Sequence, residues 1–283
     1  MSQPVRRLGV AFNPTSQASV ALRERAVEWC AANGVACVPA VAADREGLRD
    51  AVAGSHALLV VGGDGTFLRA VQGVVAEPTD VPILGVNVGK VGFLSQVDAD
   101  AFESTLGLLR SGAYALEPRM ALEVTVLSAA GQTGSPHTAL NEAAIVRGAQ
   151  PSVVRLDVAI GTSHLATYIA DGLLVATPTG STGYSFSAGG PILDPVSRNL
   201  VVTAVAAYLA AIRSVVVSPN QTVAIRILDG EVLLSIDGHD NVPLGVGDVV
   251  EVTARARPIS FVVPEGARPF WDLLRHKAEL LPS

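Results

Sequence analysis

The chain has 283 residues, of which 49% are hydrophobic and 16% are charged, and its formal net charge is -6 at pH 7. This length accommodates one large domain or two modest ones, and we expect two. Its 20 basic residues form no run that could follow a nucleic-acid backbone, so nucleic acid is excluded as an expected partner. The low share of charged residues favours a homo-oligomer, because few charges are left to cover the surface.

Cysteine usage and apolar tracts bear on location. Cys30 and Cys37 are the only cysteines, too few for a metal-ligand cluster or a disulfide framework, and we predict reduced thiols. The N-terminus lacks the apolar core of a signal peptide. The most apolar tract, "NLVVTAVAAYLAAIRSVVVSP", is interrupted by Arg213 before it reaches the roughly 20 residues of a membrane span. These features predict a cytoplasmic protein with no membrane partner.

The first part of the chain alternates short β-branched runs with helical patterns, which is typical of a parallel α/β unit. We predict strands over "LGVAFN", "VACVP", "HALLVV" and "VPILGVN". Helices are predicted over "SVALRERAVEWCAANG", which ends at Gly34, over "REGLRDAVAG" and over "DADAFESTLGLLRSG". The fold class predicted for residues 1–112 is therefore an α/β nucleotide-binding domain with a Rossmann-like parallel sheet.

The pattern of predicted elements changes after residue 112. Short strands joined by Gly, Asn, Asp and Pro turns predict a mostly antiparallel all-β domain over residues 113–263: "LEVTVL", "TALNEAAIV", "VVRLDVAI", "TVAIRIL", "EVLLSID" and "DVVEVTA". After "PISFVV", the segment "RPFWDLLRHKAELL" has the spacing of an amphipathic helix. We expect this helix, within residues 264–283, to return to the first domain.

A glycine loop follows the apolar run "LLVV". Gly62, Gly63, Asp64, Gly65 and Thr66 lie between a predicted strand and a predicted helix, where backbone N–H groups and the helix dipole favour an anionic phosphate. The loop matches neither the Walker pattern nor the G-x-G-x-x-G fingerprint.

An acid beside a phosphate loop repels its ligand unless it orients an attacking hydroxyl or holds a magnesium ion. The alternative is that Asp64 only caps the following helix.

Hydroxyl groups and glycines gather in "YIADGLLVATPTGSTGYSFSAGGPIL", residues 168–193. Such hydroxyls and bare backbone can bind a polar ligand, and Tyr184 offers an aromatic face for a ring. A Ser/Gly-rich turn explains the glycines but not Asp171, Thr179, Thr182 and Tyr184 together. A serine hydrolase is excluded, because Ser181 is not centred in G-x-S-x-G and no histidine adjoins it.

Asn141 and Glu142 stand side by side among apolar strand residues in "ALNEAAIVRG". Strand alternation sends neighbouring side chains to opposite faces, so at least one of them is a candidate to point inward. An Asn amide pairs well with an adenine edge. The alternative is a strand-end turn with a solvated glutamate.

Taken together, "GGDGTFL", "GVNVGKVGFL", "LNEAAI", "DGLLVATPTGSTGYSFSAGGPIL" and "SIDGHDNVPLGVGDVVEV" resemble the NAD kinase family, in the family's order. "RPFWDLLRHKAEL" is similar to the family's closing helix. The resemblance implies transfer of the γ-phosphoryl group of ATP to the 2'-hydroxyl of the adenosine ribose of NAD, giving NADP. ATP and NAD are then the partners, and a divalent metal such as Mg²⁺ accompanies ATP without a dedicated protein cage.

The resemblance also implies a site. Asp64 is the proton acceptor and catalytic residue, and Gly62, Gly63, Gly65 and Thr66 form the phosphate loop. The implied NAD-binding set consists of Asp64, Gly65, Arg69, Asn141, Glu142, Asp171, Thr179, Thr182, Gly183, Tyr184, Ser185, Phe186, Ser187, Ala206 and His239. In the family the acid matching Asp171 often reaches NAD across a subunit interface, which fits a homodimer or homotetramer.

Three departures from the family pattern stand out. Gly183 occupies a position that is usually Ala, and Ala207-Tyr208 replace a frequent Pro-His pair. Lys90 stands where the family is often uncharged, either as a phosphate contact or as a solvated loop charge. His239 follows the predicted hairpin turn Asp237-Gly238, and a turn-exposed imidazole is the alternative to a ligand contact.

Two other functions remain open at this point. Lipid kinases and phosphofructokinases share the Gly-Gly-Asp-Gly loop, so the loop does not name the acceptor, whereas the "TPTGSTGYS" block favours NAD. A protein that binds NAD without converting it is the second alternative, and the intact Asp64 argues against it.

Overall fold

The computed structural model describes residues 2–76, 80–89, 92–148 and 152–280. The chain forms two compact units, one of residues 1–118 with 259–283 and one of residues 119–258. The predicted boundaries, after 112 and after 263, differ from these. They place two strands in the β domain that the structure places in the sheet of the first unit, because the strand that re-enters this unit pairs both with its strand at residues 83–87 and with the strand that leaves it.

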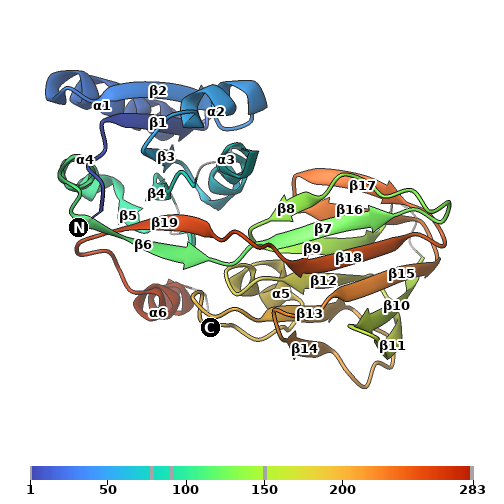
Figure 1. The fold of residues 1–283 in the computed structure, drawn as a ribbon. Coiled ribbons are helices and arrows are strands. Elements are labelled where there is room, and N and C mark those ends of the chain that lie inside the picture. The colour runs from blue at the N-terminus through green and yellow to red at the C-terminus, as the bar shows by residue number, and fades with distance from the viewer. Residues whose placement is uncertain (1, 77–79, 90–91, 149–151, 281–283) are drawn as a thin grey trace. The chain divides into compact units, whose positions relative to one another are not determined.

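The first unit is α/β, as predicted (Figure 1). Its elements are β1 (Arg7–Phe12), α1 (Gln17–Asn33), β2 (Ala36–Val41), α2 (Arg45–Val52), β3 (Ala57–Val61), α3 (Asp64–Ala76), β4 (Ile83–Asn87), β5 (Val97–Asp98), η1 (Ala99–Ala101), α4 (Phe102–Ser111), β6 (Tyr114–Arg119), β19 (Ile259–Pro264) and α6 (Phe270–Leu280).

The sheet of the first unit has the order β2-β1-β3-β4-β19-β6, and β1, β2, β3 and β4 pair in parallel. The chain continues from β1 to the strand on one side and from β3 to the strand on the other. The carboxyl ends of β1 and β3 therefore flank a topological switch point, the usual ligand position in open α/β sheets.

Helix α1 shows how local sequence sets an element. Ser16 caps its N-terminus by accepting from the Ser19 N–H, and Gly34 ends it in the left-handed conformation with φ 68°. Its Leu22, Ala26 and Cys30 are buried in a core with strand residues and with α4. On the other face of the sheet, Gly73 of α3 lets α2 approach closely.

The second unit is built from antiparallel strands. They are β7 (Leu122–Leu127), β8 (His137–Ala139), β9 (Glu142–Arg147), β10 (Val154–Ile160), β11 (Ser163–Ala170), β12 (Gly172–Ala176), β13 (Leu200–Val205), β14 (Ser214–Val217), β15 (Val223–Asp229), β16 (Val232–Ile236), β17 (Asp240–Leu244) and β18 (Val249–Ala254). Two short helical turns, η2 (Gly180–Thr182) and α5 (Tyr184–Ser187), follow β12.

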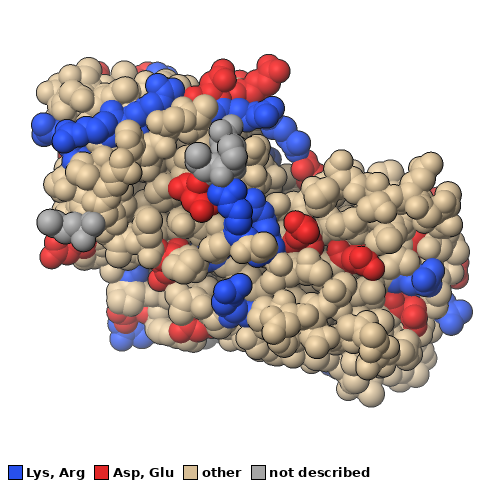
Figure 2. Space-filling view, viewed as in Figure 1, with Lys and Arg blue, Asp and Glu red and all other residues tan. Residues whose placement is uncertain are grey.

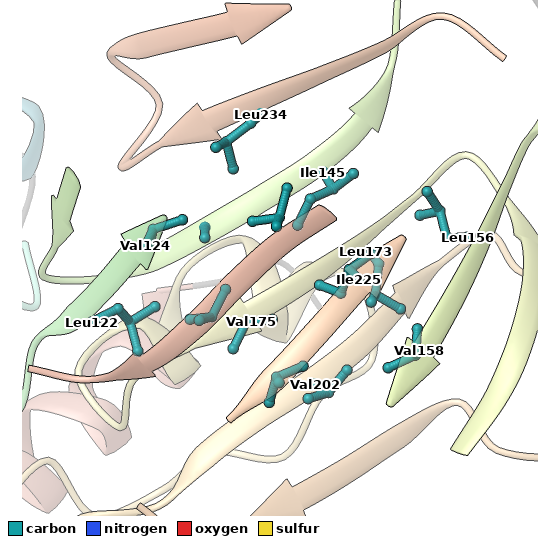
Figure 3. Close-up of a cluster of buried hydrophobic side chains, with 14 of the residues drawn as sticks. Leu122, Val124, Ile145, Leu156, Val158, Leu173, Val175, Val202, Ile225 and Leu234 are labelled. Atoms are coloured by element: carbon teal, nitrogen blue, oxygen red, sulfur yellow. The ribbon is translucent and has the colours of Figure 1, made fainter. Parts of the chain in front are cut away.

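These strands form two sheets that share one hydrophobic core. Within the described residues the orders are β11-β10-β15-β18-β7-β8 and β14-β13-β12-β9-β16-β17. Side chains of both sheets, such as Leu156 and Ile225 of one and Ile145 and Val175 of the other, belong to a single buried cluster (Figure 3). The all-β prediction for the second domain is confirmed.

One predicted strand is wrong in detail. "TALNEAAIV" forms two strands, β8 and β9, which belong to different sheets. The break falls at Leu140 and Asn141, whose backbone N–H groups donate to the Asp237 carboxylate instead of to a neighbouring strand. The break therefore places Asn141 and Glu142 at the start of β9.

On the face in Figure 2 most of the surface belongs to uncharged residues. Cys30 and Cys37 are both free thiols. No helix in the described ranges is long and apolar enough to cross a membrane.

Candidate active site

The glycine loop lies at the switch point of the first unit, directly after β3. Gly62 is buried, and a Cβ there would lie 2.6 Å from Thr66 Oγ1, so this position must be glycine for α3 to begin where it does. Gly63 O accepts from the N–H groups of Thr66 and Phe67. The N–H groups of Asp64 and Gly65 thus lie outside the helical hydrogen-bond pattern, as anion-binding helix N-termini require.

Asp64 is held by the loop that follows β4. The Phe93 N–H donates to Asp64 Oδ2 at 2.9 Å and the Leu94 N–H donates to Oδ1 at 3.1 Å. A Cβ on Gly92 would overlap the carboxylate. Both oxygens therefore have partners in another loop, which is not the arrangement of a side chain that only caps α3. Asp64 stays partly exposed.

A buried hydroxyl joins the two strand ends at the switch point. Ser19 of α1 donates to Val61 O at the end of β3 and accepts from the Asn13 N–H at the end of β1. The strand ends that flank the glycine loop are thereby fixed to each other. Gly65 and Arg69 of the same region are exposed on α3.

The second unit contains a cavity of about 500 Å³. It brings together three of the predicted site residues, Glu142, Asp171 and Tyr184, although they are up to 42 positions apart in the sequence. The remaining lining residues are Ala144, Val146, Arg147, Gly148, Val205, Ser235 and Gly238. This volume is in the usual range of small-molecule pockets.

Asp237 organises the start of β9. Its carboxylate accepts from the backbone N–H groups of Leu140, Asn141 and Glu142 at 2.8, 2.8 and 3.0 Å. Asp237 and Gly238 both have positive φ, 50° and 72°, at the centre of the turn between β16 and β17. The hairpin turn predicted at these two residues is present, with the His239 N–H donating to Ile236 O.

Two buried side-chain oxygens near this turn have no hydrogen-bond partner among the described residues: Asn141 Oδ1 and Glu142 Oε2. Burial, and next the Asp237 carboxyl, raise the pKa of Glu142 to about 8. Burial also raises the pKa of Asp237 to about 6, although its three backbone N–H donors oppose the rise. Glu142 is therefore mostly protonated at pH 7, and able to donate as well as accept a hydrogen bond.

The hydroxyl-rich loop packs against the residues at the start of β9, Leu140, Asn141 and Glu142. Thr177 Oγ1 donates to Leu140 O at 2.6 Å, and the Thr177 N–H donates to Asn141 O at 2.8 Å. A Cβ on Gly183 would lie 3.3 Å from Glu142 Oε2, so this glycine adjoins the unpartnered oxygen.

The hydroxyls of this loop divide into two groups. Thr179 and Ser185 are buried, and their hydroxyls are near Arg119 and Thr203. Thr182 is half-buried and donates to Thr179 O. The exposed side chains of the loop are those of Tyr184, Phe186 and Ser187. The structure therefore brings Tyr184 to the cavity and packs Ser185 inside the unit.

The remaining predicted residues lie around the cavity. Asp171 Oδ1 is 3.2 Å from Arg147 Nε, and both side chains are partly exposed. Ala206 is exposed, follows the lining residue Val205, and has a positive φ of 48°. His239 is half-buried beside the lining residue Gly238. Lys90 lies outside the described residues.

Sequence reasoning missed two residues. The sequence pattern indicates only a turn at Asp237, although an acid beside glycine in a hairpin also has a carboxylate free to accept nearby N–H groups. Arg147 closes the strand "EAAIVR", and nothing in its local pattern indicates that it meets Asp171, because that contact depends on the pairing of β9 with β12. Within the described ranges there is no group of three or more His, Cys, Asp or Glu that could hold a metal ion.

The fold and these features define a class. A parallel sheet presents an acid and open helix N–H groups at its switch point, and a β-rich unit contains a cavity lined by apolar, charged and aromatic side chains. This is the arrangement of a nucleotide-dependent phosphotransferase.

Comparison with known proteins identifies the family. Residues 43–114 match the model of the ATP-NAD kinase N-terminal domain, and residues 140–263 match that of the ATP-NAD kinase C-terminal domain. The chain is 44% identical to an NAD kinase of Symbiobacterium thermophilum over 78% of this chain and 77% of that protein. It is 35% identical to an NAD kinase of Chloroflexus aurantiacus over 95% and 96% of the two chains. The chain belongs to the NAD kinase family and is an enzyme that phosphorylates NAD.

Solved structures agree with the fold. The chain superposes on yeast NADH kinase in complex with NADH with a TM-score of 0.83 and 26% identity, over 98% of this chain and 88% of that one. An NAD kinase from Archaeoglobus fulgidus in complex with ATP has the same fold, with a TM-score of 0.78 and 24% identity over 98% and 100%.

Proposed function

We propose that this enzyme transfers the γ-phosphoryl group of ATP to the 2'-hydroxyl of the adenosine ribose of NAD, and that Asp64 aligns and finally deprotonates that hydroxyl. The observation that carries the acceptor side is the pair of unpartnered buried oxygens, Asn141 Oδ1 and Glu142 Oε2, the second of which belongs to a residue that lines the cavity together with Tyr184. Buried polar atoms without partners are rare, and a ligand that supplies the missing hydrogen bonds accounts for both.

On the acceptor side, the polar groups match the parts of a nucleoside. The Asn141 amide and a protonated Glu142 offer both donors and acceptors to base and ribose. Tyr184 offers a ring face, with the exposed Phe186 and Ser187 nearby in the sequence. Thr179, Thr182 and Ser185 contribute through the shape of the loop, since their hydroxyls bond or lie near protein groups. Asp171 is assigned to the nicotinamide end of NAD, and Ala206 and His239, each next to a residue that lines the cavity, are proposed as further NAD contacts.

On the donor side, the open N–H groups of Asp64 and Gly65 at the N-terminus of α3 are suited to phosphate oxygens. Gly62, Gly63 and Thr66 shape this loop, and Gly65 and Arg69, both exposed on α3, are proposed as contacts of the dinucleotide. Phosphoryl transfer depends mainly on positioning and charge neutralisation, so alignment by Asp64 precedes proton transfer. The hydroxyl proton becomes acidic as the bond to phosphorus forms, and a carboxylate then suffices as the base.

Magnesium is proposed to enter with ATP. The carboxylate of Asp64 in the glycine loop already accepts hydrogen bonds from two backbone N–H groups. A loop with this one acid suits a metal ion that is held chiefly by phosphate oxygens and water. The metal supplies neutralisation of phosphate charge. Asp64 remains the group that faces the hydroxyl.

A homodimer or homotetramer is proposed as the assembly. The loop between β13 and β14 exposes Tyr208, Leu209 and Ile212, with Leu209 85% exposed, and Ile169 and Val216 are exposed next to it. Apolar side chains gathered in this way are typical of a protein interface. The free thiols Cys30 and Cys37 support a cytoplasmic location.

The deciding experiment measures product formation with ATP–Mg²⁺ and four acceptors: NAD, NADH, sphingosine and diacylglycerol. NADP formation with no lipid product is expected. A lipid product, or NAD binding without turnover, would contradict the proposal. Light scattering of the wild type and of Leu209→Glu tests the assembly, with a smaller mass expected for the variant.

A further inference from the structure

Lys277 of α6 lies beside the loop that holds the carboxylate of Asp64. Its Nζ is 3.7 Å from the centroid of the Phe93 ring. Phe93 is also the residue whose N–H donates to Asp64 Oδ2 at 2.9 Å. One residue therefore meets an ammonium group with its ring and a carboxylate with its backbone.

The helix that carries Lys277 is held against the same loop. Phe270 and Lys277 are seven residues apart, so they share one face of α6. The Phe270 ring lies 6.3 Å from the Phe93 ring and 5.0 Å from the Trp271 ring. Leu273, which lies between them on the helix, is buried. This face of α6 therefore positions Lys277 by packing.

The ammonium group has unused hydrogen-bonding capacity. Among the described residues its close contact is the face of Phe93, and it forms no hydrogen bond or ion pair within 4.0 Å there. Burial lowers the pKa of Lys277, and the carboxylate of Asp64 opposes that effect. An ammonium has three donors, and a half-buried one gains most from an anionic acceptor.

We propose that Lys277 is a phosphate contact on the donor side, meeting the terminal phosphates of ATP beside Asp64. The inference rests on the proposed role of Asp64 at the transferred phosphoryl group. A lysine is suited to this position as a compact point charge for phosphate, and the cation–π contact with Phe93 orders it before ATP binds. The C-terminal helix then contributes directly to the reaction.

The test compares Lys277→Met with Arg275→Met, measuring kcat and the KM for ATP and for NAD by NADP formation. Arg275 lies on the same helix, its side chain is 73% exposed, and it pairs with Asp272, so its loss removes an equal charge away from the loop. For Lys277→Met we expect kcat/KM for ATP to fall roughly 10²-fold, the usual cost of one lost transition-state donor, with less than a two-fold change in KM for NAD. Lys277→Arg should recover part of the loss, and Arg275→Met should match the wild type.

Two results would overturn the inference. One is a Lys277→Met enzyme with the same kcat/KM for ATP as Arg275→Met. The other is a parallel loss for ATP and NAD, with a lowered Tm and no recovery in Lys277→Arg, which would indicate a structural role. If Lys277→Met does not fold, Lys277→Gln takes its place, and unchanged kinetics there also overturn it. Failure of the proposed function itself would appear separately, as a wild type that forms no NADP.

Discussion

The two units hold their acidic residues in opposite ways. Asp64 in the first unit is partly exposed and accepts two backbone N–H groups from a neighbouring loop. Glu142 and Asp237 in the second unit are buried, and burial raises the pKa of both, to about 8 and about 6. The first arrangement keeps a carboxylate oriented and in reach of solvent. The second suits a neutral glutamic acid that forms hydrogen bonds.

The carboxylic acid side chains of the two units are therefore suited to two different roles. An acid that must accept a proton late in phosphoryl transfer depends mainly on its orientation toward the hydroxyl. An acid that reads a nucleoside gains from a desolvated position, where each hydrogen bond is stronger and an unmet one is costly. A glycine lies next to each of two acids: a Cβ on Gly92 would overlap the carboxylate of Asp64, and a Cβ on Gly183 would lie 3.3 Å from Glu142 Oε2.

The largest effect is expected for Asp64→Asn. The amide keeps the size of the side chain but cannot take the proton and donates where the carboxylate accepts. We expect kcat to fall by roughly 10² to 10⁴, the scale of a lost general base, with little change in NAD affinity. Steady-state kinetics and NAD titration measure the two quantities. A variant with wild-type kcat would remove Asp64 from its assigned role.

Gly92→Ala tests whether the carboxylate must stay where the structure has it. The added Cβ would overlap Asp64 Oδ1, so either the carboxylate or the loop has to move. A misplacement of about 1 Å can cost roughly 10²-fold in rate, and we expect a loss of kcat of that size. Gly89→Ala is the matched control, because its Cβ would meet no heavy atom within 4 Å. Equal kcat in the two variants would contradict the prediction.

Gly180→Ala tests whether, in the second unit, the hydroxyl-rich loop must stay close to the backbone of Asn141. Its Cβ would overlap the backbone of Asn141, which has no flexible side-chain atom to move aside. We expect about 1–3 kcal/mol of lost stability from overpacking and a raised KM for NAD, with KM for ATP little changed. Gly134→Ala, whose nearest heavy atom would lie at 3.6 Å, serves as the control in denaturant unfolding and kinetics. A rise confined to KM for ATP would contradict the assignment of this loop.

Glu142→Gln gives the smallest and most pH-dependent effect. Because the folded pKa of Glu142 is about 8 and the ordinary value of a glutamate is about 4.5, the folded state binds this proton more tightly than the unfolded state does. The stabilisation of the folded state by this bound proton is complete below pH 4.5 and is lost as the pH rises through about 8. The Tm of the wild type should therefore fall relative to that of Glu142→Gln over this window, by the equivalent of about 2 kcal/mol between pH 6 and 8. Exposed Glu231→Gln should follow the wild type, and a pH-independent difference would argue against a desolvated Glu142.

Much of the first unit could be predicted from local sequence. Glycines in left-handed caps, such as Gly34 and Gly112, end helices because no other residue adopts that conformation cheaply, and they are visible in the sequence. The boundaries of the two units were harder to predict from the sequence. The strands Tyr114–Arg119 and Ile259–Pro264 follow the pattern of the β region, and only the pairing of Ile259–Pro264 with β4 on one side and with Tyr114–Arg119 on the other places them in the first sheet.

The candidate site was predictable where it consists of contiguous residues and not where it depends on pairing. The glycine loop and the Thr179–Tyr184 region are local patterns with a chemical reason. Arg147 meets Asp171 only because β9 and β12 lie side by side.

By itself the sequence determined the α/β and all-β halves, the glycine loop with its single acid, and the hydroxyl-rich loop, because periodicity and turn chemistry act over a few residues. Only the tertiary structure decided that Asp237 organises Asn141 and Glu142, that burial shifts the pKa of Glu142, and that Lys277 lies over Phe93 beside Asp64. Desolvation and long-range contact depend on segments brought together by folding, and no local pattern records which segments those are.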